Sequence, residues 1–317
     1  MQEYVIGIES SLHEFICTAK DMQGNVLSKR TGPSTNHMTI GKKAAQYRIS
    51  EMITELLASF GGEKAGCRCM IVGAAGIDSP NAKMTVADFY ASLQLMCPVF
   101  CLNDGSVALY ATTQGLGVMA ISGAGSIAVG RNKSGRITRS GGYPITIFGN
   151  EGSGQWISLS AMRHASMWID GSIPQTLLIS KIDAYFKGLD VNKLNECTNA
   201  LRRRPIDIRI ANLVFEASEE GDVTATALLR GCARALFEVT DTCVMKLGFD
   251  KEPFFLSGVW GSVFTSSKVY FDEYKALFKD KYPQSKVIFP SSDTADGAAQ
   301  MALAYLNGKI PFINDLQ

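Results

Sequence analysis

The chain has 317 residues, of which 46% are hydrophobic and 19% charged, and 31 basic against 30 acidic side chains leave a formal net charge of +1. This length exceeds what one hydrophobic core usually supports, so we expect two domains of a globular protein. The only basic tract, Arg202–Arg204, does not indicate nucleic-acid binding, and no apolar run is long enough to span a bilayer.

The first third of the chain predicts alternating strands and helices. Apolar runs with a turn between them predict an opening β-hairpin, and side chains at i, i+3, i+4 spacing predict the first long helix. Polar residues follow two of the later strands, which is typical of α/β proteins. The predicted strands are 4–8, 15–18, 26–28, 69–73 and 98–102, and the predicted helices are 41–60 and 106–114.

The same order of elements starts again at about residue 117. A strand, a glycine-containing turn and a returning strand open this half as they open the first, which indicates two related domains. The predicted elements are strands at 118–121, 127–130, 254–258 and 287–290, a mostly helical stretch over 153–247, and a final helix that begins at 295.

The turn Gly123-Ala124-Gly125-Ser126-Ile127-Ala128 matches the G-x-G-x-x-A form of the dinucleotide fingerprint. That fingerprint requires a helix next, and here the chain runs into another strand-like stretch, so we do not expect a Rossmann site. A glycine loop between two strands can still present backbone N–H groups to phosphate oxygens. The alternative is a plain tight turn.

Asp104 follows the predicted strand 98–102 and precedes a helix. A carboxylate at the end of a strand opens onto the crevice where α/β proteins bind ligands, and it could act there as a general base on a hydroxyl group. The alternative is a helix N-cap, for which aspartate is favoured.

The eight cysteines are scattered and several lie among apolar residues, where a free thiol behaves as a small hydrophobic side chain. Cys67 and Cys69 lack the spacing and the partner pair of a zinc site. The N-terminal residues show no basic segment followed by a long apolar one. We therefore expect free thiols and a cytoplasmic location.

Several motifs occur in an order that resembles the N-acetylglucosamine kinases and the wider BadF/BadG/BcrA/BcrD group of ATPases, within the actin-like sugar kinase superfamily. The most specific are Ser34-Thr35-Asn36-His37 and Gly149-Asn150-Glu151-Gly152-Ser153, and the likeness covers nearly the whole chain. The other motifs are Asn103-Asp104, Ile121–Ser126, Gly141-Gly142-Tyr143, Trp156-Ile157, Ala217–Asp222, Ser257–Trp260 and Gly297–Ala299.

The resemblance implies an α/β fold of two actin-like (ribonuclease H-like) domains with an interdomain cleft. The first domain would span residues 1–116 and the second 117–317, with the last helix as the element that could return to the first. The implied activity is ATP- and Mg²⁺-dependent phosphorylation of an N-acetylated amino sugar, N-acetylglucosamine or N-acetylmuramic acid. The implied partner is that small molecule and a second copy of the chain, with no nucleic acid and no membrane.

The resemblance also implies roles for individual residues. Asp104 would be the catalytic base, and Glu9 and Asp104 would be metal ligands. The sugar would contact Asn36, His37, Asn103, Ser126, Gly142, Tyr143, Asn150 and Glu151. The nucleotide would contact Glu9, Ser10, Ser11, His13, Gly123, Ala124, Gly125, Ala217, Gly258 and Gly297.

The sequence departs from the family pattern at three places. Ser10-Ser11-Leu12-His13 replaces a glycine run that ends in threonine, Ala124 replaces a threonine, and Asn150 replaces an aspartate. Charged acceptors bind more strongly than neutral ones, so Asn150 should weaken sugar binding. A relative that binds sugar without transferring phosphate therefore remains an alternative to a working kinase. An activator of a radical dehydratase is a third, although no cysteine lies in the glycine-flanked setting that it would need.

Overall fold

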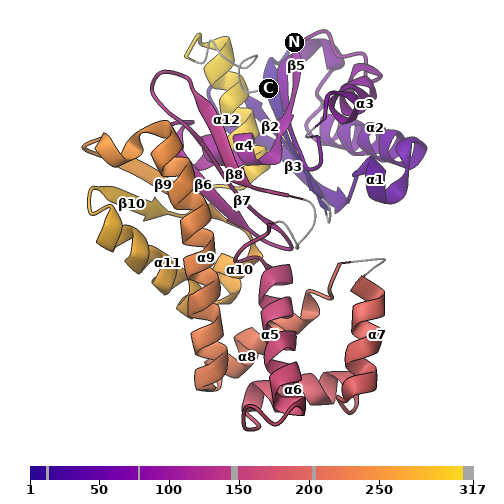
Figure 1. Cartoon of the computed structure of the whole chain (residues 1–317). Helices are drawn as coiled ribbons and strands as arrows, with labels where there is room; N and C mark the ends of the chain where they lie inside the picture. Colours follow the sequence, from indigo (N-terminus) through magenta and orange to yellow (C-terminus); the bar gives the residue numbers. More distant parts are fainter. Residues whose placement is uncertain (12–13, 78, 144–148, 202–204, 310–317) are drawn as a thin grey trace. The chain divides into compact units, whose positions relative to one another are not determined.

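The structure is a computed structural model that describes residues 1–11, 14–77, 79–143, 149–201 and 205–309 (Figure 1). The chain divides into two compact units. The first consists of Met1–Gly117, Arg131–Ile137 and the C-terminal residues from Phe289, and the second of Val118–Gly130 and Thr138–Ile288.

The first unit is a five-stranded sheet covered by helices on both faces. In the order β3-β2-β1-β4-β5, β2 is antiparallel to β1 and β3, and β1, β4 and β5 run parallel. The strands are β1 (Tyr4–Ser10), β2 (Glu14–Asp21), β3 (Val26–Pro33), β4 (Cys67–Ala74) and β5 (Val99–Asn103). The helices are α1 (His37–Ile40), α2 (Lys42–Ala58), α3 (Pro80–Ala91), α4 (Asp104–Thr113) and α12 (Thr294–Leu306), with a 3₁₀ turn, η1 (Lys64–Gly66).

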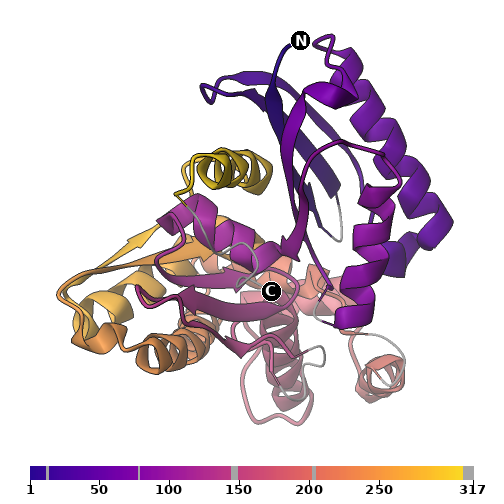
Figure 2. The same cartoon turned by 90° about the horizontal axis from the view of Figure 1, so that it is seen from above.

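Two hydrophobic clusters lie on opposite faces of this sheet because side chains alternate along each strand. Tyr4, Ile6 and Ile8 of β1 join residues of α2 and α3 in one cluster, and Val5 joins residues of α4 and α12 in the other. In Figure 2, α12 lies along the sheet on the side away from α2. The C-terminal helix thus completes the core of the first unit.

Gly7 allows α12 to approach β1 this closely. A Cβ atom at Gly7 would lie 2.1 Å from the carbonyl oxygen of Ala295 and 2.2 Å from the amide nitrogen of Ala299. A buried ion pair between Lys20 and Asp296, at 2.7 Å, joins β2 to the same helix. Glycine is therefore required in β1 by backbone packing.

The second unit has the sheet order β10-β9-β6-β7-β8, with β9 parallel to both β6 and β10. Its strands are β6 (Gly117–Ser122), β7 (Ser126–Arg131), β8 (Ile137–Gly141), β9 (Phe255–Trp260) and β10 (Ser285–Ile288). Its helices are α5 (Gly154–Ile169), α6 (Leu177–Phe186), α7 (Val191–Leu201), α8 (Arg209–Glu219), α9 (Val223–Leu247), α10 (Ser262–Ser266) and α11 (Lys268–Lys281), with a 3₁₀ turn, η2 (Phe249–Lys251). One hydrophobic cluster joins this sheet to its helices.

Numbered by their order along each unit, both sheets have the strand order 3-2-1-4-5. The α/β class and the predicted relation between the two halves are confirmed. Three elements were not predicted from the sequence: α3 at 80–91, β8 at 137–141 and α11 at 268–281. No helix in the described ranges combines the length and the apolarity that crossing a membrane requires.

Candidate active site

The predicted site residues of the first unit gather at the carboxyl ends of its parallel strands. Ser10 is paired with Ala74 between β1 and β4, and Ala74 with Asn103 between β4 and β5. Asp104 follows directly as the first residue of α4. Ligands of open α/β sheets bind at this edge, so the strand register brings Glu9, Ser10, Asn103 and Asp104 to one candidate site.

Asp104 does not cap its helix. Asn103 is the N-cap of α4, and its Oδ1 accepts from the amide of Gly105 at 2.9 Å. The Asp104 carboxylate is half-buried, and its Oδ1 accepts from the same amide at 2.8 Å. Since Asn103 fills the cap position, capping does not explain an aspartate at 104. Asn103, for which a sugar contact was predicted, therefore also caps α4.

Glu9 lies in a group of acidic side chains from distant parts of the first unit. The pKa of Glu9 is raised from its ordinary value of 4.5 to about 7, mainly by burial and less by the nearby carboxylates Glu14, Asp293 and Asp104, against a hydrogen bond from Thr294 that lowers it. Negative charge is therefore unfavourable at this position. A bound cation would relieve it.

The acidic residues at this edge fit a magnesium ion that is bound together with phosphate. Among the described residues, no three His, Cys, Asp or Glu side chains are grouped so that they could hold a metal by themselves. Mg²⁺ is usually held by one or two carboxylates, waters and substrate phosphates. Glu9 and Asp104 supply two carboxylates, and Asp104 lies close enough to raise the pKa of Glu9.

The Ser34–Asn36 segment is hydrogen-bonded to the end of β1. The Ser10 and Thr35 hydroxyls lie 2.8 Å apart, and Ser34 Oγ donates to the carbonyl of Ser11 at 2.9 Å. Arg48 of α2 fixes this segment by donating to the carbonyl of Ser34 at 2.8 Å. Neither Thr35 nor Arg48 was predicted from the sequence as a site residue.

Asn36 is buried and holds two segments in place. Its Oδ1 accepts from the amide of Met38, as the N-cap of α1, and its Nδ2 donates to the carbonyl of Ala75 at 3.2 Å. The ring of the neighbouring His37 packs against Phe89, with centroids 5.8 Å apart. His13, for which a nucleotide contact was predicted, lies outside the described residues.

In the second unit, the Gly123–Ser126 loop is held by the segment that leads into α5. Asn150, which adopts a left-handed backbone with φ of 66°, accepts with Oδ1 from the amide of Ser126 at 3.1 Å. Ser126 Oγ donates to the carbonyl of Glu151 at 2.8 Å. Two further bonds run from the amides of Gly154 and Gln155 to the carbonyls of Gly123 and Ala124, at 2.8 and 3.2 Å. The loop is therefore fixed at both ends.

This fixed loop leaves backbone donors for a phosphate. Among the described residues, the amides of Ala124 and Gly125 donate to no protein acceptor, whereas that of Gly123 donates to the carbonyl of Gly125. A Cβ atom at Gly123 would meet nothing within 4 Å, so the space beside it is open. The predicted contacts of Gly123, Ala124 and Gly125 with a nucleotide fit this geometry.

A buried hydrogen-bond network that the sequence analysis missed supports the same loop. The hydroxyls of Ser122 and Tyr270 both donate to the carbonyl of Gly152, at 2.9 and 2.7 Å. Gly152 has a φ of 75°, and a Cβ atom there would lie 2.5 Å from the carbonyl oxygen of Cys232. In the sequence, only the Gly-x-Glu-Gly-Ser motif around Gly152 indicated that this network exists.

The other predicted nucleotide contacts have structural roles of their own. Gly258 of β9 pairs with Met119 of the parallel strand β6. Gly261, which follows β9, packs against Ser122 at the end of β6. Ala217 is fully buried in α8. Gly297 lies where α12 crosses α4, since a Cβ atom there would be 2.3 Å from that of Ala111.

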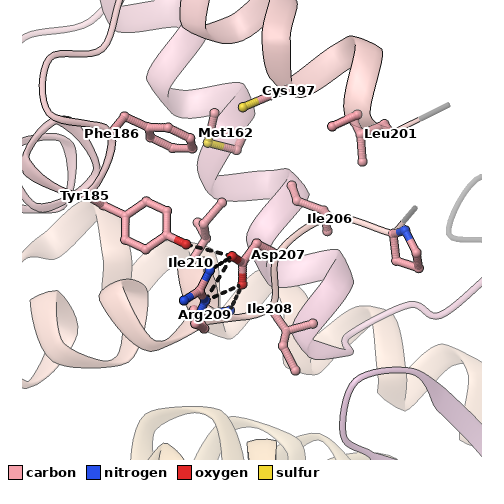
Figure 3. A pocket seen from close by; sticks show the side chains of 12 residues that line it. Met162, Tyr185, Phe186, Cys197, Leu201, Ile206, Asp207, Ile208, Arg209 and Ile210 are labelled. Carbon is pink, nitrogen blue, oxygen red and sulfur yellow. Dashed lines mark hydrogen bonds and ion pairs between the residues drawn. The ribbon is translucent and has the colours of Figure 1, made fainter. Parts of the chain in front are cut away.

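A pocket of about 540 Å³ lies among α5, α6, α7 and α8, apart from the predicted site residues of the second unit (Figure 3). Its walls are mostly apolar. Three of its polar residues are hydrogen-bonded to one another, because Tyr185 and Arg209 both donate to Asp207. The hydrogen bonds from Arg209 hold the pKa of Asp207 well below its usual range. No residue that lines this pocket was predicted for the site.

Comparison with known proteins finds relatives that span nearly the whole chain. An N-acetylmuramic acid/N-acetylglucosamine kinase of Clostridium acetobutylicum is 28% identical, and an N-acetyl-D-glucosamine kinase of Dictyostelium discoideum is 26% identical. Each alignment covers 95% of this chain and 98% of the relative.

Among solved structures, a protein of Chromobacterium violaceum described as an N-acetylglucosamine kinase has a TM-score of 0.72 at 18% identity, and the alignment covers 95% of this chain and 99% of that one. At this identity the likeness shows the fold, which is the two-domain, actin-like fold that we predicted. Residues 14–302 match the BadF/BadG/BcrA/BcrD ATPase family. Because the match spans most of the sequence, and in agreement with the predicted resemblance, the chain belongs to the BadF/BadG/BcrA/BcrD ATPase family.

Proposed function

We propose that this protein transfers the γ-phosphate of ATP to a hydroxyl group of an N-acetylated amino sugar, either N-acetylglucosamine or N-acetylmuramic acid. Membership of an ATPase family supports ATP as the donor. The names of the two relatives, which are aligned over 95% of this chain, support the class of acceptor.

The observation that carries the proposal is the register of the parallel strands in the first unit. It brings Glu9, Asn103 and Asp104 to one edge of the sheet, together with the buried Asn36. The second unit contributes the open backbone amides of the Gly123–Ser126 loop for phosphate. In the proposed function, both sets act on the same pair of substrates, one sugar and one nucleotide.

In this mechanism, the Asp104 carboxylate accepts the proton of the acceptor hydroxyl. The sugar oxygen forms a bond to the γ-phosphorus as the bond between that phosphorus and the ADP oxygen breaks, and ADP leaves. Asn36 orients the sugar by hydrogen bonds, and the Ala124 and Gly125 amides bind phosphate oxygens. Glu9 would hold Mg²⁺, which would offset the negative charge of the phosphates when bound.

A coupled assay of ADP release tests the proposal with Mg-ATP and each of N-acetylglucosamine, N-acetylmuramic acid and glucose. We expect turnover with one or both amino sugars, and a loss of roughly 10²–10⁴-fold in kcat for Asp104→Asn. Asp88→Asn, on the exposed side of α3, is the matched control and should keep full activity. Normal turnover by Asp104→Asn would refute the assignment of the base.

A second candidate is a protein that binds the sugar and transfers nothing. It is favoured by the hydroxyls of the first loop, because Ser10 is bonded to Thr35 and Ser11 Oγ donates to the carbonyl of Glu14. These hydroxyls thus serve the protein rather than a phosphate. Calorimetry separates the candidates, since this one requires that sugar binds and that ATP produces no heat.

The proposal includes a homodimer in the cytoplasm, as the sequence resemblance implies. Light scattering during gel filtration measures the mass of the assembly, for which we expect twice the 34.3 kDa of one chain. A mass that stays at one chain over a range of concentrations would contradict the dimer.

A further inference from the structure

A polar pocket of about 460 Å³ lies in the second unit beside the predicted sugar-binding residues. Tyr143 and Glu151, which we assign to the sugar, belong to its wall. Gly141, also in the wall, precedes Gly142, whose amide donates to the carbonyl of Ser126 at 3.1 Å. The pocket therefore continues outward from the residues that are expected to hold the sugar.

Two cationic side chains line the far part of this pocket. Arg139 belongs to β8 and Lys246 to the last turn of α9, and both are exposed at the rim. Lys246 Nζ donates to the backbone carbonyl of Arg139 at 3.4 Å, which keeps the ammonium group beside β8. Since the two residues come from different elements, they line one pocket only in the folded unit.

The pocket also contains carboxylates, which limits what it can bind. Glu238 lies two turns before Lys246 on α9, and Glu151 lies beside the sugar residues. Thr242 lies between Glu238 and Lys246, and its hydroxyl donates to the carbonyl of Glu238 at 3.0 Å. An anionic group is thus accepted only at the end of the pocket that Arg139 and Lys246 form.

The chemistry of the proposed substrates gives this arrangement a use. N-acetylmuramic acid is N-acetylglucosamine with a lactyl ether at O3, so it carries one carboxylate that N-acetylglucosamine lacks. Guanidinium groups bind carboxylates with two parallel hydrogen bonds, and an ammonium group adds a point charge. A hydroxyl at the same carbon needs neither the cations nor a pocket of this size.

We propose that Arg139 and Lys246 bind the lactyl carboxylate and so admit N-acetylmuramic acid as an acceptor. The inference rests on the proposed function, because it assumes that the sugar lies against Tyr143 and Glu151. It concerns the choice between substrates and leaves the chemistry of Asp104 unchanged.

The test measures kcat/KM for both amino sugars with the wild type, Arg139→Gln, Lys246→Gln and the double variant. We expect the ratio of kcat/KM for N-acetylmuramic acid to that for N-acetylglucosamine to fall about 10–100-fold in the double variant, mainly through KM. Lys251→Gln, an exposed lysine in η2 outside the pocket, should leave the ratio unchanged. The N-acetylmuramic acid methyl ester, which is neutral, should show the same loss with the wild type and no further loss with the double variant.

The outcomes separate this inference from the proposed function. If the wild type uses N-acetylglucosamine alone, or if the variants lower both activities equally, the assignment of Arg139 and Lys246 is wrong and the kinase stands. If neither sugar is phosphorylated, the proposed function fails. Calorimetry with both sugars on the same variants then tests the role of Arg139 and Lys246 in binding alone. Selective weakening of N-acetylmuramic acid binding would support the two residues, and equal weakening would overturn them.

Discussion

The carboxyl group of Glu9 makes the stability of the folded protein depend on pH. Its pKa is raised from its ordinary value of 4.5 to about 7, first by burial and then by neighbouring carboxylates. Between these values the folded chain keeps a proton that the unfolded chain has lost. The contribution of Glu9 to stability is therefore fully present below pH 4.5 and is lost as the pH rises through 7.

The size of the effect follows from the shift. A change of about 2.5 pH units between the two pKa values corresponds to about 3 kcal/mol in the free energy of unfolding. Because Glu9 keeps some contact with solvent, we expect about 1–2 kcal/mol in practice. The glutamine side chain of Glu9→Gln has the shape of a protonated glutamate and cannot ionise. This variant should therefore not lose stability as the pH rises.

Urea denaturation of the wild type and Glu9→Gln at pH 5 and pH 8, without nucleotide or magnesium, measures the effect. We expect a small difference at pH 5 and a variant that is more stable by about 1–2 kcal/mol at pH 8. Glu63→Gln, at an exposed position of the same unit, should match the wild type at both values. A difference between Glu9→Gln and the wild type that does not change with pH would refute the reasoning.

Two further substitutions test the packing and the phosphate loop. Gly7→Ala should destabilise the chain by about 3 kcal/mol or more in urea, because the new methyl group would lie 2.1 Å from the carbonyl oxygen of Ala295, whereas Gly231→Ala, on an open face of α9, should not. Asn150→Leu should raise the KM for ATP about 5–15-fold by freeing the Ser126 amide, and Asn150→Asp, which keeps the acceptor oxygen, should stay near the wild type. A stable Gly7→Ala protein, or equal KM values for the two Asn150 variants, would contradict these accounts.

The elements that the sequence predicted best have a strong period or a clear end. The helix predicted over 41–60 is α2, whose buried residues recur at helical spacing, and the opening hairpin is β1 with β2. Helix α3 was missed although Ser79 caps it and Pro80 begins it, because it buries only three of its twelve residues. Strand β8 is mostly polar and packs at the edge of its sheet, so its pattern resembles a loop.

The candidate site was predictable only where its residues follow strands. Asp104 was found because it ends a buried run of residues. Thr294, whose hydrogen bond lowers the pKa of Glu9, lies almost the whole length of the chain away, and only the packing of α12 on β1 brings the two together. No local pattern carries such a contact, because it depends on the close approach that Gly7 permits.

The departures from the family pattern have a common physical explanation in the folded units. In the first loop, the Ser10 hydroxyl is bonded to Thr35. In the second unit, Asn150 turns its amide oxygen to the Ser126 amide. Each side chain thus holds its own loop in shape, Ser10 through a hydroxyl and Asn150 through an amide oxygen. Phosphate binding by the second loop then depends on backbone donors, Ala124 and Gly125 above all, whose position Asn150 helps to fix through the Ser126 amide.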